Sequence, residues 1–393
     1  MSSNRRKTPD FRPPRWRPAI GIIVVTLIVL CWNWFLSDES MQGRVFFTGT
    51  ILVLASLLLL LWLLLFSRLK WRVRLIGLAA FVSVILVTSL SFRIRGFTGD
   101  VVPILEWRWS GSSASDLAPM TPDDGTDRAV NLDETGMDAL ALSESYPQFL
   151  GPNRDAVVTG TSLESDWKTQ PPQLIWRRPV GAGWSGFAVS AGLAVTQEQS
   201  GDDETVVAYE FLTGKEVWRY SYPARYDSGL AGLGPRATPT LDSGMVFTTG
   251  ATGILNCISL ENGTLIWSRD VIQDHGSSNP PWGNSCSPLV LRDRVIVATG
   301  AANGHSLVAY HRETGEIVWS GGSDGLGYSS PQARYLAGVE QILIFNNGSV
   351  AGHDASDGRV LWEFPWSNSQ PNVTQPLPLP NDRVLVSSGY GIG

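Results

Sequence analysis

The chain has 393 residues, of which 43% are hydrophobic and 17% charged, with 16 Trp, 3 Cys and 4 His. This apolar content excludes a disordered chain, and three cysteines are too few for a disulfide scaffold or a zinc array. A net charge of −6 argues against a nucleic-acid binder. Residues 1–74 hold 11 Lys/Arg against 3 Asp/Glu (+8), whereas residues 75–393 hold 19 against 33 (−14). The two parts are therefore expected to face different surroundings.

Three apolar runs without any Asp, Glu, Lys or Arg dominate the first quarter, at residues 19–36, 45–66 and 75–92. Because about 20 apolar residues cross the hydrocarbon core of a bilayer, the runs predict three transmembrane helices in a membrane domain at 19–95. A cleaved signal peptide is the alternative for the first run, but no small-residue cleavage site follows it. No ionisable residue lies within the runs, so they are expected to anchor the chain rather than transport a solute.

The basic residues around these runs predict the orientation of the chain. Residues 1–18 carry six Lys/Arg, and the loop at 67–74 carries four, whereas the loop at 37–44 holds Asp38, Glu39 and one Arg. Since Lys and Arg are enriched on the cytoplasmic side, we expect a cytoplasmic basic N-terminus at 1–18 and everything after the third span outside the cytoplasm.

A linker is predicted at 96–145. Residues 99–145 hold ten acidic and two basic residues and show no sustained apolar period. This composition indicates a flexible acidic stalk. Trp107 and Trp109, near its start, are expected to rest at the membrane interface.

Four segments then align without gaps, at 208–218, 257–267, 309–319 and 352–362. Each segment ends in a Trp, with a small residue ten positions before the Trp and a Gly four positions before the Trp. These glycine and tryptophan pairs are Gly214 and Trp218, Gly263 and Trp267, Gly315 and Trp319, and Gly358 and Trp362. Thr, Asn or Asp before the Gly predicts a hairpin turn in which the Gly takes a positive φ. The small residue leaves room for the large ring to dock against a neighbour.

An apolar strand precedes each hairpin, starting near Phe187, Pro239, Pro288, Pro331 and Pro376, with steps of 52, 49, 43 and 45 residues. A period of 40–50 residues with about four short strands is typical of a β-propeller. A β-sandwich is the alternative, but it would not repeat the Gly-x-x-x-Trp hairpin four times. The predicted fold is therefore an all-β propeller at 146–393, preceded by three transmembrane α-helices.

The hairpin pattern resembles the tryptophan-docking repeat Ala-x-Asp-x-x-Thr-Gly-x-x-x-Trp of pyrroloquinoline quinone (PQQ) propellers. The Asp position is filled by Glu210, Ser259, His311 and Asp354, so only the last keeps Asp. The lead-in Tyr-Pro-Gln-Phe-Leu-Gly-Pro-Asn-Arg-Asp at 146–155 resembles the start of bacterial membrane-anchored PQQ-like repeat proteins. The resemblance, to the quinoprotein alcohol dehydrogenase-like superfamily, implies an eight-bladed ring in the periplasm on an inner-membrane anchor. That superfamily includes dehydrogenases as well as scaffolds such as the propeller lipoprotein of the outer-membrane assembly machinery.

The ring is expected to be incomplete at its C-terminal side. Four blades begin near Ser185, Thr238, Ser287 and Ser330, and a fifth begins at Pro376. Residues 174–178 are predicted to form an outer strand that completes the last blade of a closed ring. A five-bladed ring closed in another way is the alternative.

Dehydrogenases of this superfamily hold PQQ over a Trp and beneath two adjacent disulfide-linked cysteines, with calcium on Glu, Asn and Asp oxygens. This sequence has no adjacent cysteine pair. Cys257 fills the small-residue position of its repeat, and Cys286 lies at a strand start, which leaves a bridge between them open. The four His do not form a site by spacing, so no metal site is predicted.

One ligand site is predicted at the channel mouth. Three residues before the strand starts lie Trp184, Arg236, Ser285 and Tyr328, and the innermost strands of a propeller line its channel. The four side chains are expected to converge and to bind a planar or anionic ligand. The alternative is that they plug the funnel.

We therefore expect a binding or scaffold module for cell-envelope components, with envelope proteins or polysaccharide as partners besides the bilayer and without a certain cofactor. The alternative is a PQQ-dependent dehydrogenase with calcium that oxidises alcohols or sugars. Its catalytic residues are not identified by the sequence.

Overall fold

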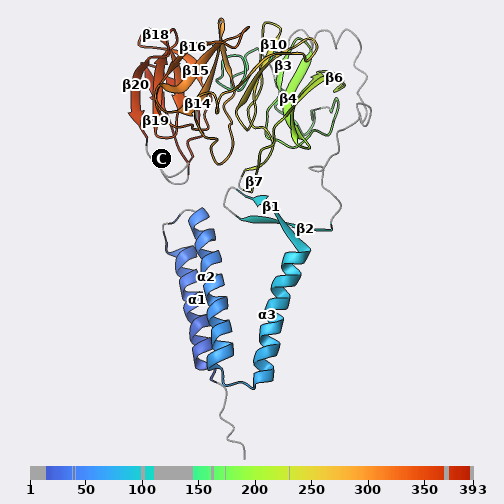
Figure 1. Cartoon of the computed structure of the whole chain (residues 1–393), viewed down its shortest axis with the longest axis vertical. Coiled ribbons are helices and arrows are strands. Elements are labelled where there is room, and N and C mark those ends of the chain that lie inside the picture. The colour runs from blue at the N-terminus through green and yellow to red at the C-terminus, as the bar shows by residue number, and fades with distance from the viewer. Residues whose placement is uncertain are drawn as a thin grey trace, which may run out of the picture. The chain divides into compact units, whose positions relative to one another are not determined.

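The computed structural model describes residues 15–37, 39, 41–98, 102–109, 145–160, 163–172, 174–229, 231–366 and 371–389. The chain divides into two compact units, Met1–Gly111 and Ser112–Gly393. Figure 1 shows the helices and one two-stranded hairpin in the first unit, and the four-stranded sheets in the second. Each unit is described by itself below.

Three long apolar helices make up most of the first unit. They are α1 (Arg17–Phe35), α2 (Met41–Leu61), which continues as a π-helical turn at Trp62–Phe66, and α3 (Trp71–Ser91). All three are long and apolar enough to cross a membrane. The predicted helices are confirmed, but each begins two to four residues before its apolar run, because the flanking basic and aromatic residues continue the same helix. Between α1 and α2, the Asn33 side-chain amide donates to the Arg44 carbonyl over 3.0 Å.

A β-hairpin that the sequence analysis did not predict follows α3. Its strands are β1 (Phe92–Phe97) and β2 (Pro103–Trp107), paired antiparallel with a bulge between Ile94 and Gly96. The predicted linker at 96–145 thus begins inside this hairpin. Most of the rest of that linker, residues 110–144, lies outside the described residues.

Four antiparallel four-stranded sheets form the blades of the second unit. The first holds β3 (Ala188–Ser190), β4 (Leu193–Ser200), β5 (Asp203–Glu210) and β6 (Glu216–Pro223), and the second β9 (Thr240–Asp242), β10 (Met245–Thr249), β11 (Ile254–Ser259) and β12 (Leu265–Asp270). The third holds β13 (Leu289–Leu291), β14 (Arg294–Ala301), β15 (His305–His311) and β16 (Ile317–Gly321), and the fourth β17 (Gln332–Leu336), β18 (Val339–Phe345), β19 (Ser349–Asp354) and β20 (Val360–Pro365). Two short pairs accompany them, β7 (Asp227–Ser228) with β8 (Gly232–Leu233), and β21 (Leu377–Leu379) with β22 (Arg383–Leu385). The total number of blades in the ring stays a prediction.

The first strand of each blade begins one residue after its predicted start. These strands lie next to one another at the centre of the unit, with contacts of β3 with β9, β9 with β13, and β13 with β17. Hydroxyl groups link neighbouring starts: the backbone N–H of Thr238 donates to Ser287 Oγ, and that of Ser287 donates to Ser330 Oγ, each over 2.9 Å. The starts of the inner strands are thereby fixed at a common level.

The repeated Trp docks onto the next blade. Within each blade it pairs across the sheet with the small residue of the pattern, as Cys257 does with Trp267. Its ring then covers the hairpin glycine of the following blade: Trp218 covers Gly263, Trp267 covers Gly315, and Trp319 covers Gly358. The indole N–H of Trp218 also donates to the Leu260 carbonyl over 2.8 Å. The predicted docking is therefore an interaction between blades.

Residues 174–178 differ from the prediction. They form no strand, because no neighbouring strand pairs with them in the described part of the chain. Trp176 nevertheless covers Gly214 of the first blade and donates its indole N–H to the Phe211 carbonyl over 2.8 Å. The segment thus makes the docking contact expected of a preceding blade without the strand.

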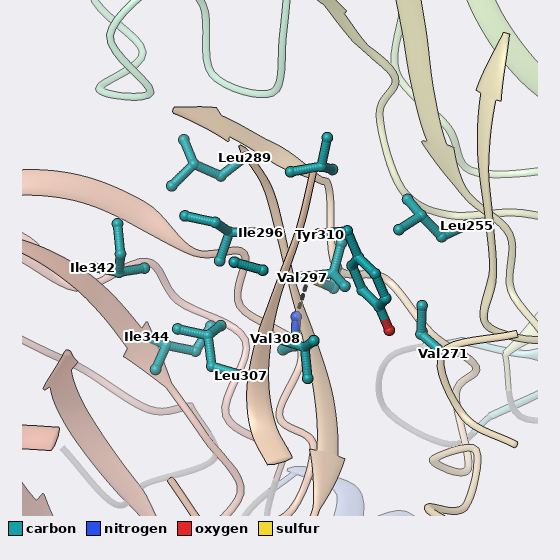
Figure 2. Close-up of a cluster of buried hydrophobic side chains, with 14 of the residues drawn as sticks. Leu255, Val271, Leu289, Ile296, Val297, Leu307, Val308, Tyr310, Ile342 and Ile344 are labelled. Carbon is teal, nitrogen blue, oxygen red and sulfur yellow. Dashed lines mark hydrogen bonds between the residues drawn. The ribbon is translucent and has the colours of Figure 1, made fainter. Parts of the chain in front are cut away.

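Apolar contacts between blades form the core. Figure 2 shows the third blade between its neighbours. Ile296 and Leu307 lie on the side of Ile342 and Ile344 from β18, whereas Tyr310 lies on the side of Leu255 from β11. These side chains are almost completely buried. The third sheet is therefore covered on both faces, which explains why its central strands read as continuous apolar runs.

Candidate functional site at the channel mouth

The structure brings the four predicted residues together along neighbouring blades. Each lies in the loop before an inner strand. Ser285 Oγ donates to the Tyr328 carbonyl over 3.1 Å, and the Trp184 backbone N–H donates to the Pro235 carbonyl, next to Arg236, over 2.8 Å. Arg236 is close enough to Tyr328 to lower the pKa of its phenol, although burial raises that pKa to about 12 overall. The four residues form one continuous arc at the starts of the inner strands.

Arg236 holds the loop in front of it. Its guanidinium donates to the carbonyls of Ala231 (2.6 Å), Gly232 (3.1 Å) and Gly234, and it stacks over the Tyr226 ring with 4.7 Å between guanidinium carbon and ring centre. Burial lowers its pKa. Both terminal nitrogens thus donate to backbone carbonyls, so Arg236 orders the loop at the mouth.

Two further aromatic residues, which the sequence analysis missed, complete the mouth. Tyr226 donates its hydroxyl to the Pro281 carbonyl over 2.6 Å. The Trp282 ring meets Tyr328 edge to face, with 5.8 Å between centres. Trp282 could have been found because it precedes Ser285 by three residues in a Gly-rich segment, whereas Tyr226 lies in a loop that the repeat does not align. With Trp184, whose side chain is 69% exposed, they give the mouth an aromatic surface.

Arg154 is the other residue that the sequence analysis missed, and it lies buried at the starts of the inner strands. Although 96% buried, it donates to the carbonyls of Ser287, Pro288 and Pro331, and to Gln148 Oε1 over 2.8 Å. Burial lowers its pKa to about 9. The lead-in segment that carries it is bound to the inner strands by the Tyr146–Val189 bridge. A single guanidinium therefore joins the third and fourth blades through backbone carbonyls, and the second blade through the Thr240 hydroxyl at 3.4 Å.

A small cavity borders this arginine. It has a volume of about 250 Å³ and is lined by residues that include Arg154, Arg334, Gln332 and Leu377. Sites for drug-sized ligands occupy about 300–1,000 Å³. The cavity is therefore smaller than a site for a large cofactor.

Glu204 is buried behind the mouth. Its carboxylate accepts the backbone N–H of Ala251 over 2.9 Å and the hydroxyl of Tyr222 over 2.7 Å. Burial raises its pKa, and Arg236 acts in the opposite direction. Because both of its oxygens already accept hydrogen bonds, Glu204 ties the first blade to the turn after β10.

The cysteines and histidines have structural surroundings. Cys257 and Cys286 are free and buried, so the bridge left open by the sequence is not formed. Burial raises the thiol pKa of Cys257 to about 12 and that of Cys286 to about 11. His275 and His305, distant in sequence, lie with 5.1 Å between their rings, and His275 Nε2 is hydrogen-bonded to the Tyr310 hydroxyl over 2.8 Å.

The residues described here do not fit the PQQ–calcium arrangement implied by the resemblance. In the described ranges no group of three or more His, Cys, Asp and Glu side chains is close enough to hold a metal ion. The two propeller cysteines do not form a disulfide, and the terminal nitrogens of Arg236 donate to backbone carbonyls. We therefore assign no chemistry to this cofactor in the described part of the chain.

Comparison with known proteins identifies the class of the domain. Residues 202–392 match a family model described as "Outer membrane protein assembly factor BamB". This match and the fourfold Trp-docking repeat show that residues 202–392 are a region of PQQ-like repeats. The search of curated proteins found no match.

Solved structures with similar chains include both kinds of PQQ-like protein. A europium-containing methanol dehydrogenase is 16% identical over 51% of this chain and 44% of its own, with a TM-score of 0.36. A quinohemoprotein alcohol dehydrogenase from Pseudomonas putida HK5 is 15% identical over 53% of this chain and 37% of its own, with a TM-score of 0.36. BamB from Moraxella catarrhalis is 16% identical over 53% of this chain and 77% of its own, with a TM-score of 0.30. The chain thus spans less than half the length of the two dehydrogenases.

Proposed function

We propose that this chain is a membrane-anchored PQQ-like propeller that acts as a binding and scaffold module for cell-envelope components. The observation that carries the proposal is the role of two arginines: Arg154 binds the starts of the second, third and fourth blades, and Arg236 binds the loop in front of it. Groups that satisfy one another in this way rigidify a scaffold. The basic residues around the helices support an inner-membrane location with a cytoplasmic N-terminus and a periplasmic propeller.

The surface proposed to contact the partner is the aromatic mouth. Trp184 and Trp282 remain exposed there, by 69% and 37%. Tyr328 packs edge to face against Trp282, and the Tyr226 hydroxyl donates to the carbonyl of Pro281, the residue before Trp282. Trp and Tyr are enriched at the centres of protein–protein contacts, because they offer large apolar area with few rotatable bonds. We infer that an envelope protein or polysaccharide binds across this arc.

A photo-crosslinking amino acid placed at position 184 or 282 tests this proposal in intact cells. We expect discrete adducts from both positions, because a partner across the mouth would touch both indoles. The matched control is position 167, whose Trp is 58% exposed but lies in the segment before the blades. Adducts at 184 and 282 that are no more frequent than those at 167 would refute the mouth as the contact surface.

A further inference from the structure

A β-hairpin follows α3 without a linker. Helix α3 ends at Ser91, and its part after the basic first turn, residues 75–91, spans about 26 Å at 1.5 Å per residue, close to the roughly 30 Å hydrocarbon core. Strand β1 starts at Phe92, the residue directly after the helix, so no linker separates the two. The backbone N–H of Arg108, directly after β2, donates to the Ser91 carbonyl over 2.8 Å and holds the open end of the hairpin against the helix terminus.

The two faces of this hairpin differ in chemistry. Phe92 pairs with Trp107 and Ile94 with Leu105, and these four side chains share one face because directly opposed residues point the same way. Arg93 pairs with Glu106 on the other face, where they form an ion pair of 2.9 Å. The hairpin is therefore amphipathic across its thickness.

The apolar face is exposed and rich in aromatic rings. Phe92 meets Trp107 edge to face with 5.2 Å between centres, and Trp107 meets Trp109 in the same way at 5.3 Å. Ile94 and Leu105 extend this surface and are both more than half exposed. A two-stranded hairpin alone is at best marginally stable in water, so such a face requires an apolar partner.

We propose that this hairpin lies in the headgroup–acyl boundary of the leaflet in which α3 ends, with its apolar face in the bilayer. Covalent continuity with a spanning helix places the face at that depth, where aromatic rings are favoured. Arg108, directly after β2, supplies positive charge at the level of the headgroups, whereas the charge of Arg93 on the opposite face is balanced by Glu106. The bilayer surface, and not only the three spans, would then fix the direction in which the chain leaves the membrane.

Site-specific labelling of the full chain in lipid vesicles tests this proposal. The starting variant is Cys31→Ala, because Cys257 and Cys286 are buried and their raised thiol pKa values make them unreactive. An environment-sensitive fluorophore is attached to Leu105→Cys on the apolar face. The matched control is Ile104→Cys, the neighbouring residue on the opposite face, with 45% exposure against 55%.

We expect the label at 105 to emit at shorter wavelength and to be quenched severalfold more strongly by lipids spin-labelled near the headgroup than the label at 104. Equal quenching at both positions, or no quenching at either, would overturn the proposal. A blue-shifted label at 105 that lipid quenchers do not reach would also overturn it, because the face would then be covered by protein.

Discussion

Replacing Gly263 with Ala is expected to destabilise the propeller by about 2–5 kcal/mol. Gly263 has a φ of +72°, and an L-residue in the left-handed region costs about 1–2 kcal/mol. A Cβ atom at this position would also lie less than 3.0 Å from the Trp218 ring. Overpacking of this kind costs about 1–3 kcal/mol and would displace the indole from its hydrogen bond with Leu260. The midpoint of urea unfolding of the full chain in detergent measures the effect.

Gly244→Ala is the matched control in the same blade. Gly244 has a similar φ of +78°, but nothing lies within 4 Å of the position of its Cβ. Gly244→Ala should therefore lower the free energy of unfolding only by the cost of the left-handed backbone conformation, about 1–2 kcal/mol. Equal losses for the two variants would contradict the account of Trp docking as a force between blades.

Replacing Arg154 with Ala is expected to destabilise the propeller by about 3–5 kcal/mol, because each buried polar group left without its partner costs about 1–3 kcal/mol. The substitution leaves the carbonyls of Ser287, Pro288 and Pro331 without their donor inside the unit. Arg154→Lys should restore only part of the loss, because an ammonium lacks the planar fork that reaches several acceptors at once. Urea unfolding followed by tryptophan fluorescence measures both variants.

Arg359→Ala serves as the control for the loss of one arginine. Arg359 is exposed and makes only long ion pairs, 3.5 Å to Asp354 and 4.0 Å to Asp357. Exposed pairs contribute about 0–1 kcal/mol. If Arg154→Ala were no more destabilising than Arg359→Ala, the hydrogen bonds of Arg154 could not be what holds the lead-in segment against the inner strands.

The repeat made most of the propeller predictable. A Gly that needs a positive φ and a Trp four residues later form a local pattern, and the small residue opposite the Trp is fixed by the register of the same hairpin. The inner strands could be located because each one precedes a repeated hairpin at a similar spacing. Which glycine each Trp covers was beyond the sequence, because that contact joins two blades about 45 residues apart.

Three features could not be read from local patterns. Arg154 lies in an Asn-Arg-Asp sequence that is typical of an exposed turn, and only the arrangement of three blades around it makes it buried. The hairpin at Phe92–Trp107 follows an apolar helix directly, and its strands are too short for a clear alternation. The four aligned residues of the mouth were predicted from position alone, whereas Tyr226 belongs to a loop without an equivalent in the other repeats.

Titration of the purified full chain with PQQ and calcium tests the central claim most directly. We propose that the propeller is a binding and scaffold module, in which Arg236 and Arg154 hydrogen-bond to backbone carbonyls at the starts of the inner strands. We therefore expect no saturable change in cofactor absorbance at micromolar PQQ and no reduction of an artificial electron acceptor with alcohols or sugars. Stoichiometric PQQ binding with turnover would contradict the account and would establish a quinoprotein dehydrogenase.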